Sequence, residues 1–476
     1  MPEIINMTID QLHNAYTKKE LTVTEVVLAH LSRIAKIDSN ETGLKSVIEI
    51  NPDAIFLAKA MDKELEDMDN LPPLFGIPIL LKDNINTNDR MHTTAASVSL
   101  KDNYAPYDAH IVEKIRAAGA LILGKLNMTE FANYMTREGM PNGYSSRGGQ
   151  ALNPYNKEKD TGGSSAGSGV AIAARLATLA VGTETSGSII SPSLRNGLVG
   201  IKPTMGLVSR SGIVPISITQ DTAGPMARTV KDTAILLNIL QGYDQKDIAT
   251  HITKKQEKID YTKFLNGKNL VGIRIGVNKY QKEGGLDLCA EADLDKLCAQ
   301  LKDAGATLIE NIDLGEEYDI VKILDHEFKA CMNYYLSTLG ESTKLKTLDD
   351  IINYNQAHAK TALKYGQSLL LNSQNNSTGN LTEPEYIEAL IAREQMISKL
   401  NKIFDENRLD AVLGMAFSSI APFTGFPSMT VPLGQNQEDN MPIGSYWIAK
   451  PFNEGALVKI GHAVEEIVNF KGMFEV

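Results

Sequence analysis

Residues 162–190 read GGSSAGSGVAIAARLATLAVGTETSGSII, in which an apolar stretch separates two turns made of small residues. We expect a helix to begin near Ser165 and a strand to span Ala177 to Val181, although the weakly polar run Gly169 to Gly182 by itself favours a buried helix. Small residues expose backbone N–H groups, and a helix N-terminus attracts negative charge. The two turns therefore mark a candidate site.

The pattern around this stretch is typical of α/β layering. Met7 to Ile37 predicts two amphipathic helices, with Thr22 and Glu25 forming a capping box, and residues 284–405 are mostly helical in pattern. Helix Ile111 to Ala118 lies between two predicted strands. Strands are expected at Ile77–Leu81, Ala120–Leu123, Leu270–Val277, Ala306–Ile309, Asp410–Leu413, Ser428–Pro432 and Ile443–Ile448.

Composition excludes several classes of protein. The chain has 476 residues, 43% of them hydrophobic and 22% charged, which is typical of a globular protein rather than a disordered one. Its net charge of −11 repels phosphate backbones, so no nucleic-acid partner is expected. No signal peptide or membrane-spanning run is read, and Cys289, Cys298 and Cys331 fit reduced structural thiols. These features favour a cytoplasmic location and no membrane partner.

A lysine at the end of an apolar strand suggests the chemistry. Lys82 closes the run Ile79 to Lys82, and Ser164 and Ser188 lie in the two small-residue turns. Serine needs a base to become a nucleophile, and a buried lysine with a lowered pKa can serve. A phosphate-binding loop is disfavoured because no Gly-Lys-Ser/Thr follows the glycines. The eight histidines lie in no local signature, and a Ser-His-Asp triad stays open as an alternative.

Together these motifs resemble the amidase signature family. The segments that carry the resemblance are Lys82–Asn84, Gly162–Ser165, Gly182–Ile189, Gly200–Thr204, Asp221–Arg228, Gly425–Ser428 and Met441–Gly444. They match that family in order and spacing over nearly the whole chain. Segments such as Asn142–Gln150 and Asn355–His358 are similar to its bacterial peptide-amidase-like branch, whose members release ammonia from C-terminally amidated peptides or small amides.

The resemblance implies a Ser-cisSer-Lys mechanism with a serine acyl-enzyme and neither metal nor cofactor. Ser188 would attack the amide carbonyl while Ser164 passes its proton to neutral Lys82. The backbone N–H groups of Thr185, Ser186, Gly187 and Ser188 would hold the oxyanion. We expect Asp83 and Thr183 to orient Ser164 and Lys82 from behind. Aromatic residues that could line the substrate pocket are Tyr134, Tyr144 and Phe426.

The resemblance also implies the fold, a single α/β/α domain over residues 1–476 with a large, mixed, twisted sheet covered by helices on both faces. Within it we expect an N-terminal helical segment over about residues 1–70, a catalytic core over about 71–240 and a helical insertion over about 320–405. The expected activity is hydrolysis of carboxylic amides, including peptide C-terminal amides, and the expected partner is a small-molecule or peptide amide. The sequence does not give the oligomeric state.

Two other functions compete with this interpretation. One is the glutaminase A subunit of a tRNA-dependent amidotransferase. This function is disfavoured because Ile190 occupies a position where that family commonly has arginine. The segment Leu413 to Phe426 also lacks the charged residues expected to hold a free amino acid. The other is a non-catalytic, anion-binding or scaffold homologue that uses the Gly/Ser loop without chemistry.

Overall fold

The computed structural model describes residues 3–279, 290–315, 319–470 and 472. Within them an 11-stranded mixed sheet runs in the order β1-β3-β2-β6-β8-β7-β12-β13-β11-β9-β10, and β4 pairs with β5 in a separate ribbon. The strands are β1 (Val47–Ile50), β2 (Pro78–Lys82), β3 (Leu121–Leu126), β4 (Tyr144–Ser145), β5 (Gly149–Gln150), β6 (Leu179–Glu184), β7 (Val199–Lys202), β8 (Thr222–Ala227), β9 (Arg274–Asn278), β10 (Thr307–Ile309), β11 (Ala411–Gly414), β12 (Ser428–Gln435) and β13 (Pro442–Ala449).

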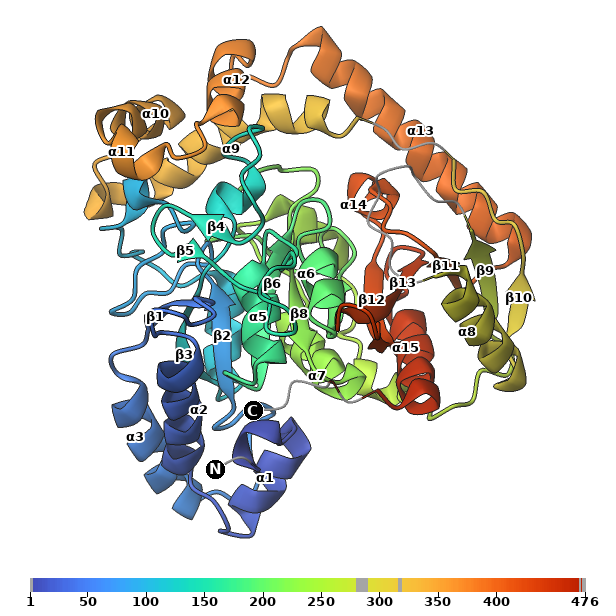
Figure 1. Cartoon of the computed structure of the whole chain (residues 1–476). Coiled ribbons are helices and arrows are strands. Elements are labelled where there is room, and N and C mark those ends of the chain that lie inside the picture. Colours follow the sequence, from blue (N-terminus) through green and yellow to red (C-terminus); the bar gives the residue numbers. More distant parts are fainter. Residues whose placement is uncertain (1–2, 280–289, 316–318, 471, 473–476) are drawn as a thin grey trace.

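Helices surround this sheet in the fold (Figure 1). The α-helices are α1 (Ile9–Thr17), α2 (Val23–Ile37), α3 (Ala54–Glu66), α4 (His110–Ala117), α5 (Ala166–Ala173), α6 (Ile190–Arg195), α7 (Val230–Leu240), α8 (Glu291–Asp303), α9 (Val321–Thr338), α10 (Leu348–Ala357), α11 (Ala359–Ala362), α12 (Ser368–Asn376), α13 (Pro384–Asn407), α14 (Ile420–Thr424) and α15 (Glu454–Val468). Short 3-10 turns are η1 (Ile4–Asn6), η2 (Val98–Leu100), η3 (Glu130–Asn133), η4 (Ile248–Thr253), η5 (Tyr261–Phe264) and η6 (Gly340–Ser342).

Close contacts at glycines show which helices cover each face of the sheet. Gly182 of β6 lies against Ser165 at the start of α5, and Gly444 of β13 lies against Leu194 of α6. On the opposite face, Gly461 of α15 lies against Met429 and Val431 of β12. A side chain at any of these glycines would meet its neighbour at less than 3.0 Å. The predicted α/β/α layering, with helices on both faces, is confirmed.

Local sequence signals account for the N-terminal helices. Thr22 and Glu25 form the predicted capping box, in which each side chain accepts a hydrogen bond from the other residue's backbone N–H. Thr8 and Gln11 form a second capping box at α1. The region expected to be helical, residues 1–70, also contains strand β1, which pairs antiparallel with β3. All four residues of β1 are only half-buried, so this short strand shows no alternation of buried and exposed positions.

Residues 169–182, for which a buried helix was favoured, contain two elements. Helix α5 ends at Ala173, Arg175 takes a left-handed conformation with φ of +60°, and β6 begins at Leu179. Both elements are fully buried, so neither shows an amphipathic period.

The helices from α9 to α13 arch along the upper border of the molecule in Figure 1. Phe328 and Met332 of α9 pack into an apolar cluster with Val214 and Ile216, which come from the loop between β7 and β8. Cys298 and Cys331 are free and buried, whereas Cys289 lies outside the described residues. No helix in the described part of the chain is long and apolar enough to cross a membrane.

Candidate active site

Lys82 is the last residue of β2 and is completely buried. Strands β2 and β6 are parallel neighbours, so their carboxyl ends meet at the same edge of the sheet. Lys82 Nζ lies 2.8 Å from Ser164 Oγ, 2.9 Å from Thr183 Oγ1 and 3.1 Å from the carbonyl oxygen of Thr183. Burial lowers the pKa of Lys82 to about 7, although the nearby carboxylates of Asp221 and Glu184 act to raise it. Burial therefore favours the neutral amine over the ammonium.

Ser164 lies just before the short helix α5 and follows two glycines, at which a side chain would clash with neighbouring atoms. The peptide bond between Gly163 and Ser164 is cis. A Cβ on Gly162 would lie 2.7 Å from Pro192, and one on Gly163 would lie 2.5 Å from Asn142 Oδ1. The next residue, Ser165, donates its hydroxyl to the Thr183 carbonyl and its backbone N–H to the Ser188 carbonyl. These bonds hold the two small-residue turns side by side.

The turn from Thr185 to Ser188 is fixed from both ends. Glu184 Oε2 accepts hydrogen bonds from the backbone N–H groups of Ile189 at 2.8 Å and Ile190 at 3.1 Å. Thr185 donates its hydroxyl to Asp221 at 2.5 Å. Gly187 has φ of +77°, and a Cβ there would lie 3.0 Å from the ring of Phe417. Ser188 is 6% exposed at the end of this rigid turn.

Asn84 and Thr183 complete the surroundings of Lys82. Asn84 Nδ2 donates to Thr183 Oγ1 at 2.9 Å, so the threonine hydroxyl receives hydrogen bonds from both side chains. The expected contact between Thr183 and Lys82 is therefore present in the structure. No role was predicted for Asn84, although its place next to the strand end could have suggested one.

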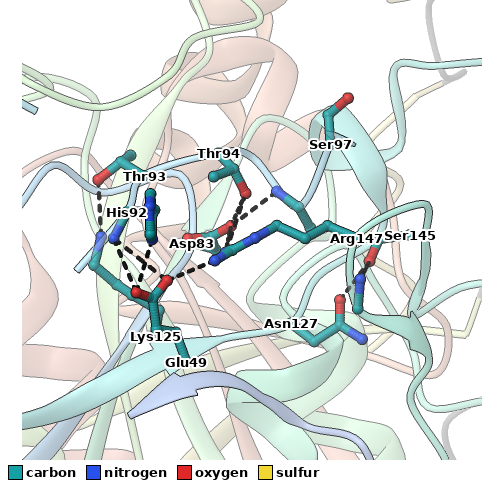
Figure 2. Close-up of polar contacts among 12 residues, drawn as sticks. Glu49, Asp83, His92, Thr93, Thr94, Ser97, Lys125, Asn127, Ser145 and Arg147 are labelled. Carbon is teal, nitrogen blue, oxygen red and sulfur yellow. Dashed lines mark hydrogen bonds and ion pairs between the residues drawn. The ribbon is translucent and has the colours of Figure 1, made fainter. Parts of the chain in front are cut away.

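Asp83 belongs to a different polar cluster, shown in Figure 2. Its Oδ2 accepts hydrogen bonds from the Thr94 hydroxyl, from the Ala96 N–H at 3.0 Å and from Arg147 Nη1 at 3.5 Å. Arg147 in turn donates to Glu49 at 2.6 Å. Neighbouring side chains of an extended segment point to opposite sides, so Asp83 points away from Lys82. It fixes the chain after β2 rather than contacting Ser164 or Lys82.

A cavity of about 550 Å³ opens beside these residues. Asn84, Thr183 and Thr185 line it. Most of the remaining lining comes from the loop between β7 and β8 and from helix α9, including Val214, Ile216, Cys331 and Tyr335, and Lys246 and Asp247 also contribute. This volume is in the range of small-molecule sites, which are mostly apolar with a few polar groups.

None of the three aromatic residues proposed for the pocket lines this cavity. Tyr134 is buried, with its ring 4.6 Å from that of Phe328 and its hydroxyl donating to Asp325. Phe426 is fully buried, and its ring centroid lies 6.0 Å from that of Phe404. Both are core residues and neither lines the cavity. Tyr144 lies edge-on to Tyr365 on a partly exposed surface and also does not line it.

The residues that do line the cavity were missed for a physical reason. Most are ordinary apolar or small residues on loop 210–222 and on α9, far from the glycine-rich motifs in sequence. Asp221 lies within a family motif, but nothing in the sequence places its carboxylate against Thr185. Phe417 lies in the segment 413–426, which lacks the charged residues expected to hold a free amino acid, and its ring packs on Gly187.

Comparison with known proteins is consistent with this site. The profile of the family described as Amidase matches residues 25–422. A probable amidase from Arabidopsis thaliana is 36% identical over 478 residues, which cover 96% of this chain and 89% of that protein. The A subunit of a glutamyl-tRNA(Gln) amidotransferase from Clostridium botulinum is 31% identical over 508 residues, covering 99% of each chain.

Among solved structures, the peptide amidase from Stenotrophomonas maltophilia superposes with a TM-score of 0.90 at 36% identity. The match covers 99% of both chains. The whole fold, including the arch of helices α9 to α13, is therefore shared with that enzyme.

Proposed function

The chain belongs to the amidase signature family, and we propose that it hydrolyses carboxylic amides through an acyl-enzyme on Ser188, with Ser164 and Lys82 as the proton relay. Enzymes of this class need a nucleophile, a base and donors for the oxyanion. The observation that carries the proposal is the 2.8 Å contact between Ser164 Oγ and a fully buried Lys82 Nζ. A buried ammonium is costly, so this environment favours the neutral amine that a base requires.

The contacts of Lys82 orient its lone pair. The Thr183 carbonyl can only accept hydrogen bonds, so one N–H of the amine points to it. A second N–H points to Thr183 Oγ1. The lone pair of the neutral amine is then left for the Ser164 hydroxyl, which donates to it.

The reaction follows from this arrangement. Ser188 Oγ bonds to the amide carbon as its proton moves to Ser164, whose own proton moves to Lys82. The carbonyl becomes an oxyanion, held by backbone N–H groups of residues 185–188. When the oxyanion collapses, the C–N bond breaks and Ser164 returns a proton to the leaving amine while Lys82 returns one to Ser164. Water then hydrolyses the ester by the same relay and yields the acid.

Peptide C-terminal amides are the proposed substrates. The 36% identity to a peptide amidase over 99% of both chains supports this class, as does a cavity large enough for an amino-acid residue. The alternative is the glutaminase component of an amidotransferase, since the A subunit of such an enzyme is also a relative. The two differ in substrate charge, because glutamine carries an ammonium and a carboxylate near its amide.

A serine-directed fluorophosphonate tests the relay. We expect it to label the wild-type protein at Ser188, with labelling lost in Ser188→Ala and reduced at least 100-fold in rate in Lys82→Met, since general bases contribute about 10²–10⁴. Lys125→Met is the matched control, because Lys125 is equally buried on the neighbouring strand β3 but contacts Ile85 and Thr93 instead. Full labelling of Lys82→Met would contradict the lysine relay and favour a histidine base.

Ammonia release identifies the substrate. The panel contains a peptide C-terminal amide, a free amino-acid amide, an aryl amide and glutamine. Activity on glutamine alone would instead support the amidotransferase alternative, and an unlabelled Ser188 without ammonia release would support a non-catalytic homologue.

A further inference from the structure

The cavity beside Lys82 contains an ion pair that is closed on itself. Arg210 donates from Nε and Nη2 to the two oxygens of Asp247, at 2.9 Å and 2.5 Å. It also donates from Nη1 to the carbonyl of Ile218. Asp247 further accepts the backbone N–H groups of Arg210 and Ala249. Each charge is thus already neutralised by its partner rather than directed at a ligand.

The carboxylate of Asp221, which also lines the cavity, is occupied in the same way. One oxygen accepts the Thr185 hydroxyl, and the other accepts the N–H groups of Ile216 at 2.7 Å and Ser217 at 2.9 Å. Burial raises the pKa of this carboxyl. A ligand ammonium would have to compete with three donors for it.

The remaining wall is uncharged, apart from an exposed lysine at the mouth. Val214, Ile216 and Tyr335 are buried apolar or aromatic residues, and Tyr335 uses its hydroxyl to donate to Asn86. Burial holds the Cys331 thiol protonated by raising its pKa well above the usual range. Lys246 is solvent-exposed, with its ammonium 5.9 Å from the ring centroid of Tyr107, where water screens its charge.

We propose that this cavity selects amides whose acyl group is uncharged and apolar, and that the closed Arg210–Asp247 pair is the residue pair that enforces this selection. The inference rests on the proposed function, because it takes the cavity as the acyl-group site. A charged acyl group entering the cavity loses its water without gaining a free counter-charge, which is strongly unfavourable. Glutamine and amides whose acyl group carries a carboxylate are therefore poor substrates, and amides with neutral acyl chains are good ones.

The mouth of the cavity extends the apolar surface outward. Tyr334 is 70% exposed and Ile218 is 45% exposed, and both line the cavity. An acyl group that continues into a peptide chain passes over these two side chains. The preferred substrates are thus amides of apolar residues at the C-terminus of a longer uncharged chain.

Two pairs of isosteric amides test the selection by ammonia release. In the first pair, 4-carbamoylbutanoate carries a carboxylate where 5-methylhexanamide carries an isopropyl group. In the second, 5-aminopentanamide carries an ammonium where hexanamide carries a methyl group. We expect the neutral member of each pair to be favoured at least about 100-fold in kcat/KM. Equal kcat/KM values within a pair would overturn the proposal.

Opening the ion pair should change the selection in opposite directions. In Asp247→Asn, Arg210 is freed, and the ratio of kcat/KM for 4-carbamoylbutanoate to that for 5-methylhexanamide should rise about tenfold or more. In Arg210→Gln, Asp247 is freed, and the corresponding ratio for 5-aminopentanamide should rise instead. These ratios cancel general losses of activity or folding, and structural damage alone would not produce opposite shifts.

Asp108→Asn is the matched control, because it removes a carboxylate from an ion pair with Arg116 that does not line the cavity. Both ratios should stay at their wild-type values in this variant. The assigned role of the Arg210–Asp247 pair is wrong if Asp247→Asn leaves the ratio of kcat/KM for 4-carbamoylbutanoate to that for 5-methylhexanamide at the wild-type value. It is also wrong if Asp108→Asn raises this ratio as much as Asp247→Asn does.

Fluorophosphonate labelling separates this inference from the proposed function. If Ser188 is labelled but none of the four amides is hydrolysed, their protection of Ser188 against labelling measures binding directly, and the neutral members should protect at least tenfold better. Equal protection would refute the selection while leaving the relay intact. If Ser188 is neither labelled nor active, the proposed function fails, and the inference fails with it.

Discussion

The pH dependence of kcat/KM should report the ionisation of Lys82. Burial lowers its pKa from 10.5 to about 7, and only the neutral amine can accept the Ser164 proton. The rate should therefore rise tenfold per pH unit below pH 6 and reach a plateau above pH 8. Between pH 6 and pH 8 the neutral fraction rises from about 9% to about 91%, so kcat/KM should rise about tenfold. A neutral amide must be the substrate, so that only the enzyme titrates.

Glu184→Gln is the variant that moves this ionisation. The Glu184 carboxylate acts to raise the pKa of Lys82, so removing its charge should lower that pKa further and shift the rising limb to lower pH. The glutamine oxygen can still accept from Ile189 and Ile190, which preserves the turn that ends at Ser188. A merely structural effect would lower the plateau of kcat/KM at high pH without shifting the pH at which kcat/KM rises.

Two results would refute the reasoning. With an unshifted pKa of 10.5, kcat/KM would rise about 100-fold between pH 6 and pH 8 and would show no plateau below pH 10. A limb near pH 7 that persists in Lys82→Met would belong to another group, such as a histidine. Ammonia release measured over pH 5 to 10 distinguishes both cases from the expected curve.

Three further variants test the site and its surroundings. Lys82→Met should be more stable than wild type at pH 7, and this advantage should shrink by about 2 kcal/mol by pH 9 in urea unfolding. The unfolded lysine keeps its proton up to pH 10.5, whereas the folded one loses it near pH 7, so wild-type stability rises with pH in this window. Phe426→Ala should cost about 3–5 kcal/mol of stability, measured by the same method, and leave the preference between isosteric amides unchanged, as expected of a core residue. Gly187→Ala should reduce the labelling rate of Ser188, because its φ of +77° and the Phe417 ring at 3.0 Å oppose a side chain.

The proximity of Lys82 and Ser164 could be predicted from the sequence because both residues lie in short, contiguous motifs. Lys82 follows an apolar run that had to be a buried strand, and glycines flank both Ser164 and Ser188. The structure brings Lys82 and Ser164 into contact across 82 positions of sequence. Thr183, which was also expected to lie behind them, is part of β6, the parallel neighbour of β2.

The substrate pocket could not be predicted in the same way. An aromatic residue has the same sequence signal in a core as in a pocket, and Tyr134 and Phe426 are buried in the core. The wall instead combines loop 210–222 with helix α9, and their proximity depends on long-range packing. Glu327 of α9 accepts hydrogen bonds from Ser217 and Thr219, a contact that no local pattern could reveal.

A low lysine pKa is not sufficient to identify the base, because three lysines in the described part of the chain are fully buried at strand positions. Burial lowers the pKa of Lys125 and of Lys202 to about 8, close to that of Lys82. Lys202 Nζ donates to the Pro203 carbonyl, and Lys125 Nζ contacts the Ile85 carbonyl and the buried Thr93 hydroxyl. Neither Thr93 nor Pro203 lines the cavity. Among these three, Lys82 alone contacts a serine beside the Ser188 turn and a threonine that lines the cavity, so geometry rather than pKa supports Lys82 as the proposed base.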